Sequence, residues 1–249
     1  MIELRGVSHR YVATRGAYLA TTHAVVDVNL TVPAQQFVSI VGPSGCGKTS
    51  LLRIVAGLLV PSEGDVVVDG RPVRGPAPDR ALVFQHAALF PWRTVAANVG
   101  FGLEVSRRDR KAAPEIVARQ LDLVGLSEFA GHYPSELSGG MQQRVGLARA
   151  LAVSPEILLM DEPFGSLDAI TRKQLAEELL HVWEHDQRTV VFVTHSLEEA
   201  LVLSDRVVVM RGGRIVRDVP VELPRPRRPD DLLDDPQFLA LRRGLSELL

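Results

Sequence analysis

A glycine-rich loop ending in a lysine and a threonine is the first chemical feature of the chain. Residues 42–49 read GPSGCGKT, between a strand-like run, Phe37–Val41, and an apolar helical segment, Leu51–Ala56. Glycines let successive backbone N–H groups point at an anion, and a helix start adds partial positive charge. We expect Lys48 to reach the β- and γ-phosphates of a nucleotide and the Thr49 hydroxyl to bind Mg²⁺. The alternative is a plain glycine-rich turn.

An acidic pair supplies the partner that such a phosphate loop needs. Asp161 and Glu162 follow the strand-like run Ile157–Met160. We expect Asp161 to hold Mg²⁺, through water, and Glu162 to lie near the γ-phosphate and polarise water for in-line attack. A strand that ends in a solvated acidic pair is the alternative, and the phosphate loop argues against it.

A second glycine-rich helix start lies further along the chain. Residues 137–144 read LSGGMQQR, in which Ser138 is placed to N-cap a helix and the two glycines after it leave backbone donors open to an anion. One nucleotide site does not require two such helix starts. The second start is therefore predicted to serve a site on another subunit.

Alternating apolar runs and helical patterns predict the elements that hold these motifs. The strand-like runs are short and almost entirely apolar, which predicts a parallel sheet covered on both faces by helices. They are Phe37–Val41, Ala81–Phe84, Ile157–Met160, Thr189–Thr194 and Arg206–Met210. Thr31–Pro33 and Val66–Val68 are more polar and indicate an antiparallel portion near the N-terminus.

Helical signals dominate from Gln85 to about Val153, which indicates a helical subdomain inserted into the α/β core. Five prolines between Asp218 and Pro236 predict a linker, and a last helix follows with Asp235 as N-cap and Pro236 at its first position. The sequence leaves open whether that helix is a dimer contact or a regulatory flap.

Composition excludes several classes of protein. The chain has 249 residues, 46% of them hydrophobic, and a net charge of −2, so no basic field marks a nucleic-acid binder. Its single cysteine, Cys46, excludes an internal disulfide framework and fits a reducing compartment. Apolar runs are far shorter than the roughly 20 residues of a membrane span. We expect a cytoplasmic chain that serves a membrane only through partners.

These motifs together resemble the ATPase subunits of the ABC transporter family, from Ile2 to about Arg217. The resemblance implies an α/β fold of the P-loop NTPase type, with a RecA-like parallel sheet, an N-terminal antiparallel portion and an inserted helical subdomain. It implies that residues 1–85 and 154–217 form the ATP-binding core. Residues 86–153 would then be the helical signature subdomain, and residues 218–249 a C-terminal linker and helix.

The resemblance also implies roles for the matching residues. The Walker A loop would be Gly42, Pro43, Ser44, Gly45, Cys46, Gly47, Lys48 and Thr49, followed by Ser50. Ser138, Gly139 and Gly140 match the signature sequence, Gln85 the Q-loop glutamine and Asp161 the Walker B aspartate. Glu162 matches the catalytic glutamate, Asp168 lies in the D-loop at 166–168, and His195 matches the switch histidine. Without the motifs, Gln85 is a polar strand end and His195 a solvated or helix-capping histidine.

At three positions, the family pattern does not assign a role to the residue unambiguously. Tyr11 is similar in position to the aromatic residue that stacks on adenine, but the long segment Arg15–His23 makes Tyr18 a competitor. Met141 stands in the signature where many members have glutamine. Cys46 is either a small filler or a thiol activated by the helix N-terminus, whose alkylation would block ATP binding and be prevented by bound ATP.

The implied mechanism uses two copies of the chain, which sandwich two MgATP between the loop of one copy and the signature of the other. Mg²⁺ is held by Thr49, Gln85 and Asp161, while Lys48 and the signature donors stabilise the phosphoryl charge. Glu162 polarises the attacking water, which His195 orients together with the γ-phosphate. Closure of the pair then drives integral membrane permease subunits at the cytoplasmic face of the inner membrane. A periplasmic or lipoprotein substrate-binding protein takes part indirectly, and nucleic acid does not.

The apolar segment Ala87–Trp92 suits a groove that receives a short partner helix, or else it tucks into its own subdomain. The stretches Leu89–Val95 and Asn98–Leu103 resemble bacterial importers for taurine, other sulfonates and nitrate, with taurine as the first choice. A nitrate or other small-solute importer is the alternative. A non-transport ABC ATPase lacks support because no long coiled-coil insertion or second cassette is present. A small-molecule kinase leaves the signature segment unexplained.

Overall fold

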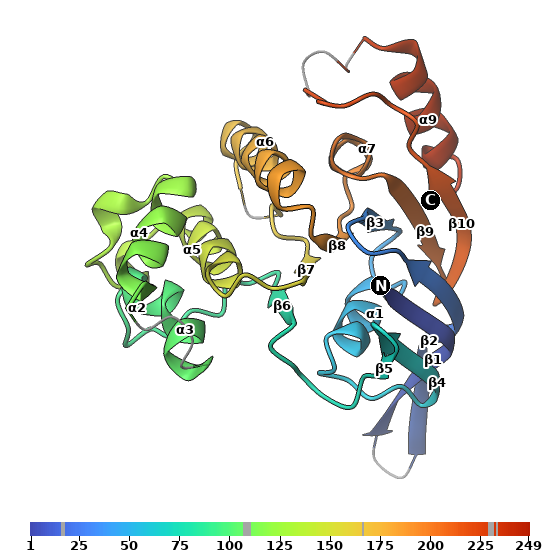
Figure 1. The fold of residues 1–249 in the computed structure, drawn as a ribbon. Helices are drawn as coiled ribbons and strands as arrows, with labels where there is room; N and C mark the ends of the chain where they lie inside the picture. The colour runs from blue at the N-terminus through green and yellow to red at the C-terminus, as the bar shows by residue number, and fades with distance from the viewer. Residues whose placement is uncertain (16–17, 107–110, 166, 229–231, 233) are drawn as a thin grey trace. The chain divides into compact units, whose positions relative to one another are not determined.

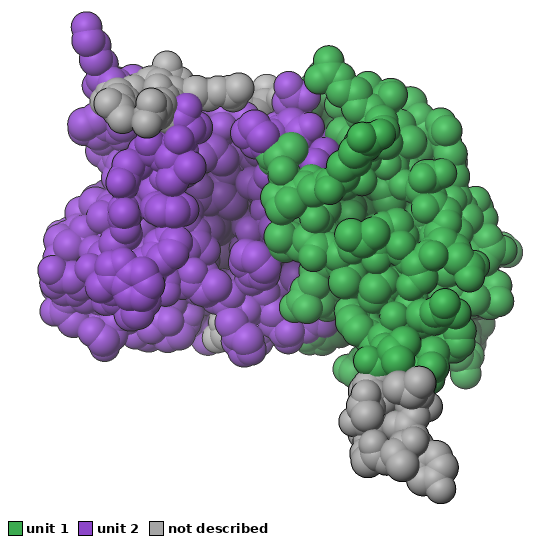
Figure 2. All heavy atoms as spheres, turned by 90° about the horizontal axis from the view of Figure 1, so that it is seen from below, with its two compact units in different colours: residues 1–77, 187–249 green, residues 78–186 purple. Residues whose placement is uncertain are grey.

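A computed structural model of the chain describes residues 1–15, 18–106, 111–165, 167–228, 232 and 234–249, without the side chains of residues 13–15, 18–19 and 185–186. The chain divides into two compact units (Figure 2). Unit 1 contains Met1–Ala77 and Gln187–Leu249, and unit 2 contains Pro78–Asp186. The division into core and helical subdomain at residues 85–86 and 153–154 stays a prediction.

Unit 1 begins with an antiparallel sheet (Figure 1). Its strands are β1 (Ile2–Arg15), β2 (Tyr18–Val32), β4 (Glu63–Val68) and β5 (Arg71–Pro72), in the order β2-β1-β4-β5. In β1, Ile2, Leu4 and Val7 are buried, and Ile2 pairs with both Val32 and Val68. The predicted antiparallel portion near the N-terminus is therefore confirmed.

The parallel strands of unit 1 carry the phosphate loop. β3 (Phe37–Val41) lies between β8 (Thr189–Val193) and β9 (Arg206–Arg211), parallel to both, and β10 (Arg214–Pro220) pairs antiparallel with β9. Every residue of β3 and β8 is buried, which explains why these strands are almost continuously apolar in sequence. Two helices complete this part, α1 (Lys48–Val55) after β3 and α7 (Leu197–Leu203) after β8.

Unit 2 combines two parallel strands with helices. β6 (Arg80–Val83) pairs with β7 (Ile157–Asp161), with Ala81 opposite Leu158. The chain between them forms α2 (Val95–Val99), α3 (Phe101–Ser106), α4 (Ala113–Leu123), two short 3₁₀ turns (Ser127–Phe129 and Pro134–Glu136) and α5 (Gly139–Ala152). α5 packs against α2, α3 and α4, so the inserted helices share one centre. The predicted helical insertion is confirmed.

The helix boundaries of unit 2 follow the sequence signals. α4 has Pro114 in its first turn, and Gly125 adopts a positive φ of 62° just after it. α6 (Ala169–Asp186) buries Leu175, Leu179 and Trp183, whose spacing of four residues places them on one face of the helix.

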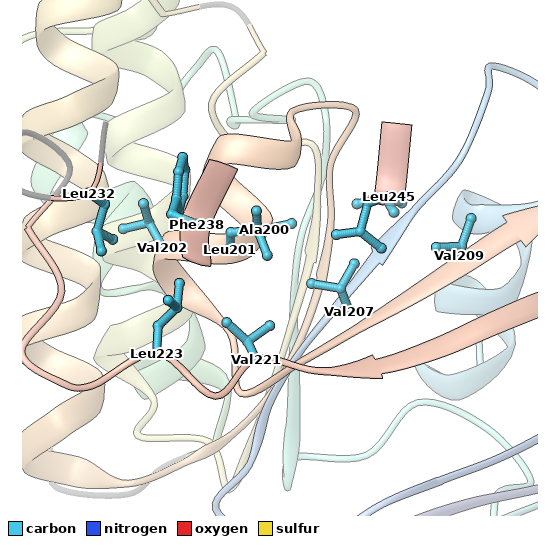
Figure 3. Packing of buried hydrophobic residues seen from close by; sticks show 11 residues of the cluster. Ala200, Leu201, Val202, Val207, Val209, Val221, Leu223, Leu232, Phe238 and Leu245 are labelled. Atoms are coloured by element: carbon cyan, nitrogen blue, oxygen red, sulfur yellow. The ribbon is translucent and has the colours of Figure 1, made fainter. Parts of the chain in front are cut away.

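The C-terminal part packs back onto unit 1. α9 (Pro236–Ser246) starts as predicted, because Asp235 Oδ1 accepts hydrogen bonds from the backbone N–H groups of Gln237 and Phe238 at 2.8 and 2.9 Å. The linker interpretation of the prolines before it is wrong in one respect. Val221, Leu223 and Leu232 are buried in a hydrophobic cluster with Phe238 of α9 (Figure 3). Prolines keep a chain extended in a packed connection as well as in a solvated one.

Within the described ranges, no helix combines the length and the apolar character needed to cross a bilayer.

Candidate functional site

Two glycines of the phosphate loop have no room for a side chain. A Cβ on Gly42 would lie 2.2 Å from the Met210 carbonyl oxygen, and one on Gly47 would lie 2.0 Å from that of Ala24. Gly47 also has a φ of 102°, and Gly45 a φ of 79°. These conformations favour glycine. The loop is therefore fixed between β9 and β2, with Ser44 exposed at its tip.

Lys48 turns inward from the first position of α1. Its side chain is only 5% exposed, and Nζ donates to the carbonyl oxygens of Gly42 at 2.7 Å and Pro43 at 3.2 Å. Gly47 is the N-cap of α1 and provides no side-chain cap, so the backbone donors of the first turn are left for another acceptor. A buried ammonium beside an uncapped helix start is the arrangement that binds a phosphate.

Cys46 lies inside the loop beside this ammonium. Its thiol is buried, and Sγ lies 4.0 Å from Lys48 Nζ. A Cβ on Gly42 would approach Sγ to 2.7 Å, so sulfur fills the centre of the turn. The packing fits the filler interpretation. Its alkylation, and protection by ATP, stays a prediction.

Tyr11 reaches the same helix from β1. Its hydroxyl lies 3.2 Å from Ser50 Oγ. Its ring and the His9 ring form a T-shaped pair with their centroids 4.8 Å apart, and 41% of the residue is exposed. An exposed aromatic ring next to the phosphate loop is suited to stacking on a base. The side chain of its competitor, Tyr18, lies outside the described residues.

In unit 1, the predicted switch histidine, His195, lies at a corner fixed by hydrogen bonds on both sides. His195 is exposed, between β8 and α7. On its two sides, Ser196 Oγ accepts the Glu199 N–H at 3.2 Å, and Thr194 Oγ1 accepts the Ser196 N–H at 3.0 Å and hydrogen-bonds to the Glu199 carboxylate. Ser196, rather than His195, caps the helix. The helix-capping alternative for His195 is therefore wrong.

In unit 2, the structure brings Gln85 and Glu162 together. Gln85, two residues beyond β6, donates from Nε2 to Glu162 Oε2 at 3.3 Å. Glu162 follows β7 and has a φ of 46°, which is uncommon outside glycine, and its carbonyl accepts the Gly165 N–H at 3.1 Å. The buried Asp161 precedes it as the last residue of β7. The turn after β7 thus places the Glu162 carboxylate within hydrogen-bonding distance of Gln85.

The second helix start is capped, unlike the first. Ser138 has the extended conformation of an N-cap, and its Oγ accepts the Met141 N–H at 3.3 Å, as predicted. A Cβ on Gly139 would meet nothing within 4 Å, whereas one on Gly140 would lie 3.0 Å from Leu167. Gly139 thus presents an open backbone surface. Met141 is half-buried.

The same helix holds the segment around Gln85 through two residues that the sequence analysis missed. Gln143 Nε2 donates to the Phe84 carbonyl at 2.9 Å, and Arg149 donates to the carbonyls of Ala87 at 2.7 Å and Ala88 at 2.9 Å. Burial lowers the pKa of the Arg149 guanidinium. The available signal was a glutamine and an arginine on the two sides of the apolar run Val145–Ala148 in α5, with Arg144 directly after the glutamine.

Asp168 caps α6, next to the signature. Its Oδ1 accepts the N–H groups of Ile170 at 3.1 Å and Thr171 at 3.0 Å. The backbone hydrogen bond from Thr171, followed by one from the Thr171 side chain, lowers the pKa of Asp168 and keeps it ionised. Leu167 is buried, and the other D-loop residue, Ser166, lies outside the described part of the chain.

The candidate residues therefore form two groups. Unit 1 holds Tyr11, the phosphate loop and His195, while unit 2 holds the remainder, namely Gln85, Ser138, Gly139, Gly140, Asp161, Glu162 and Asp168. The set proposed for Mg²⁺, Thr49, Gln85 and Asp161, offers a hydroxyl, an amide oxygen and a carboxylate. Such oxygen donors fit Mg²⁺, which binds through one or two carboxylates plus phosphates. Among the described residues, no cluster of three or more His, Cys, Asp or Glu forms an all-protein metal cage.

Comparison with known proteins shows the family of the chain. A family model described as ABC transporter matches residues 25–165. An uncharacterized ABC transporter ATP-binding protein of Methanocaldococcus jannaschii is 50% identical over 91% of this chain and 84% of its own length. The taurine import ATP-binding protein TauB of Rhizobium johnstonii is 45% identical over 98% of this chain and 95% of its own. The nitrate import ATP-binding protein NrtD of Synechococcus elongatus is 42% identical over 98% and 89%.

A solved structure matches as well. It is titled as the dimeric, post-hydrolysis state of the ATP-binding cassette MJ0796 bound to ADP and Pi. Its chain superimposes with a TM-score of 0.81 at 33% identity, covering 90% of this chain and all of its own. The predicted α/β fold of the P-loop type is thereby confirmed.

Proposed function

The chain belongs to the ABC transporter family as an ATP-hydrolysing subunit of an importer, and we propose that it powers uptake of a small anionic or zwitterionic solute, taurine or another sulfonate first. The observation that carries the ATPase mechanism is the presence of two glycine-rich helix starts in one chain. One encloses a buried lysine, and the other is open and capped by serine. A protein with only one phosphate-binding site would not need the second helix start.

In the proposed site, the uncapped start of α1 and Lys48 bind the β- and γ-phosphates, and Tyr11 stacks on adenine. Glu162 takes a proton from the attacking water, and the Gln85 amide holds the glutamate carboxylate until the nucleotide arrives. His195 orients the γ-phosphate and the water. Bound Mg²⁺, held by Thr49, Gln85 and Asp161, supplies charge neutralisation at the phosphates.

The proposed site is completed by a second copy of the chain. Gly139 has open space where a side chain would be, and the signature has no lysine of its own, so its backbone donors suit an anion delivered from outside. The dimeric, ADP-bound relative supports this arrangement. In a two-fold symmetric pair, each signature closes over the nucleotide of the other copy.

Membrane permease subunits are the proposed partners, bound at the segment Ala87–Trp92. The Phe90 ring packs on the Phe101 ring with their centroids 4.5 Å apart, while Trp92 is 72% exposed. Half of the segment thus tucks into its own subdomain and half faces outward, which favours docking of a partner helix around Trp92. Trp92→Ala is expected to keep ATP hydrolysis and to lose permease association. Unchanged association would contradict docking here.

This docking would place the chain at the cytoplasmic face of the inner membrane, with a periplasmic or lipoprotein substrate-binding protein acting only through the permease. Taurine is favoured over nitrate because the segments around Leu89–Val95 and Asn98–Leu103 resemble the taurine branch, and because the taurine import relative is 45% identical to this chain and the nitrate import relative 42%. A nitrate importer is the second candidate, supported by a relative at similar identity.

Growth of the source organism without this gene tests the solute. The deletion strain is grown with taurine, another alkanesulfonate or nitrate as the sole source of sulfur or nitrogen. Loss of growth on taurine, restored by the wild-type gene and not by Glu162→Gln, is expected. Normal growth on taurine with loss of growth on nitrate would identify nitrate as the solute and leave the ATPase mechanism unchanged. Restoration by Glu162→Gln would contradict the assigned catalytic base.

A further inference from the structure

The chain after β10 returns to α7, the helix that follows the switch histidine. Val221, Leu223 and Leu232 from this segment and Phe238 and Leu245 from α9 are buried together. They meet Ala200, Leu201 and Val202 of α7 and Val207 and Val209 of β9 (Figure 3). We call residues 221–228, 232 and 234–249 the C-terminal brace. Its cluster is continuous with the core of unit 1.

A buried arginine of the brace binds the C-terminal end of α7. Arg227 is only 4% exposed and donates to the carbonyls of Leu201 at 3.0 Å and Ser204 at 2.6 Å. It also donates to those of Val221 and Leu223 in the brace itself. The last carbonyls of a helix lack partners within the helix, and a cation there suits the helix dipole. Arg227 thus joins helix and brace.

A second arginine extends the connection to the strand that leads into the phosphate loop. Arg225 donates to the Leu203 carbonyl at 2.9 Å and to Asp205 Oδ1 at 2.8 Å. The other oxygen of Asp205 accepts the Phe37 N–H at 2.9 Å, at the start of β3. The end of α7 is therefore fixed both to the brace and to β3.

The brace also reaches the first turn of α7. Leu197 packs against the buried cluster, and Arg242 of α9 pairs with Glu198 at 2.9 Å. The next residue, Glu199, fixes the corner of His195, because its carboxylate accepts a hydrogen bond from the Thr194 hydroxyl and its backbone N–H donates to Ser196 Oγ. An exposed ion pair alone contributes little, so most of the support comes from the apolar packing.

We propose that the C-terminal brace is a positioning element for the switch: through α7 it holds the corner on which His195 stands. This rests on the proposed role of His195 in orienting the γ-phosphate and the attacking water. The brace touches neither nucleotide nor water itself. Loosening it should therefore lower the turnover number kcat and leave the KM for MgATP almost unchanged.

Substitutions of neighbouring α9 residues test the proposal in the full-length chain. Phe238→Ala empties the centre of the cluster, Phe238→Leu refills most of it, and Leu239→Ala is the control, because Leu239 is 38% exposed outside the cluster. Phe238→Ala should lower kcat roughly 5- to 20-fold with KM within about twofold, as expected for misplacement of a positioning group. Phe238→Leu should recover most of this loss, and Leu239→Ala should have no effect.

The His195→Ala background separates positioning from general damage. Turnover is measured by release of radiolabelled phosphate from MgATP, so that low rates are still resolved. If the brace acts through His195, Phe238→Ala causes no further loss there. An equal fold-loss in both backgrounds would overturn the brace proposal and leave the role of His195 intact. Full turnover by His195→Ala alone would instead refute the role of His195, and the brace proposal with it.

A surface variant covers the case in which Phe238→Ala does not fold. Arg242→Glu places like charges at the first turn of α7 without opening the core, since both members of the pair are partly exposed. It should lower kcat about twofold, and adding Glu198→Arg should restore it. Where Phe238→Ala does not fold, unchanged kcat in Arg242→Glu would overturn the proposal.

Discussion

The two glycine-rich helix starts of the chain look alike in sequence and differ in construction. At α1, the loop is wedged between backbone carbonyls, the N-cap is Gly47 in a left-handed conformation, and Lys48 is buried within it. At α5, Ser138 caps the helix and Gly139 faces open space. The first start contains its own counter-charge for an anion. The second start offers backbone hydrogen-bond donors but no charged side chain.

The difference teaches how one chain can contribute to two sites. A loop with its own buried cation can bind a phosphate alone, whereas an open, uncharged helix start adds only short-range hydrogen bonds to an anion that something else has brought. In the proposed mechanism, the two similar motifs therefore make unequal contributions: α1 sets nucleotide affinity, and α5 sets whether the bound nucleotide is hydrolysed.

The largest expected effect on ATP hydrolysis comes from two substitutions, one that removes the positive charge at the α1 start and one that adds a negative charge at the α5 start. Lys48→Ala should lower ATP hydrolysis by about 100-fold or more and weaken MgATP binding as well, because it removes the cation of the loop. Gly139→Asp should lower hydrolysis comparably and leave MgATP binding to the monomer unchanged. Fluorescent-nucleotide titration beside phosphate release measures both. Equal binding losses in the two variants would remove the distinction.

Alanine at the two glycines should sharpen the comparison through stability. A Cβ at Gly47 collides with the Ala24 carbonyl at a positive φ, so Gly47→Ala should lower the free energy of unfolding by roughly 2–4 kcal/mol. Gly139→Ala meets no atom and should leave it unchanged or raise it by up to about 1 kcal/mol. Chemical denaturation measures both. A destabilised Gly139→Ala would show that the open surface is structural.

Arg149 tests whether α5 also controls the Q-loop. Arg149→Ala removes donors to two carbonyls next to Gln85 and should lower kcat about 3- to 10-fold, with little change in MgATP binding. Arg149→Lys keeps one donor and should recover part of the loss. The KM-against-kcat split is the readout. A change in binding alone would place Arg149 in the nucleotide site instead.

The smallest effect concerns the cap at Asp168. Its pKa is lowered, so the carboxylate contributes stability above its unfolded pKa of about 4, and this is lost as pH falls through the folded pKa. Asp168→Ala should therefore lower Tm slightly at pH 7, and the difference from wild type should shrink toward acid pH. Asp168→Asn caps without titrating and should show a weaker pH dependence. A constant difference from wild type across pH would contradict the ionised cap.

Local signals predicted much of this molecule. β3 and the caps at Ser138 and Asp235 were foreseeable, because each depends on a few neighbouring residues. Side-chain contacts across long separations were not. The hold of Arg149 on Ala87, the positive φ of Glu162 and the burial of Arg227 among α7 carbonyls depend on packing that periodicity does not encode. The burial of Val221 and Leu223 in the proline-rich tail was not predicted for the same reason, because it depends on contacts across long separations.

A mixing experiment tests the shared site most directly. Lys48→Ala and Gly139→Asp chains, each nearly inactive alone, are combined with MgATP, and phosphate release is followed. If α1 of one copy works with α5 of the other, a mixed pair has one site with both starts intact, and the mixture should recover up to about a quarter of wild-type hydrolysis. Activity no higher than that of the separate variants would show that both starts act within one chain, and would contradict the account.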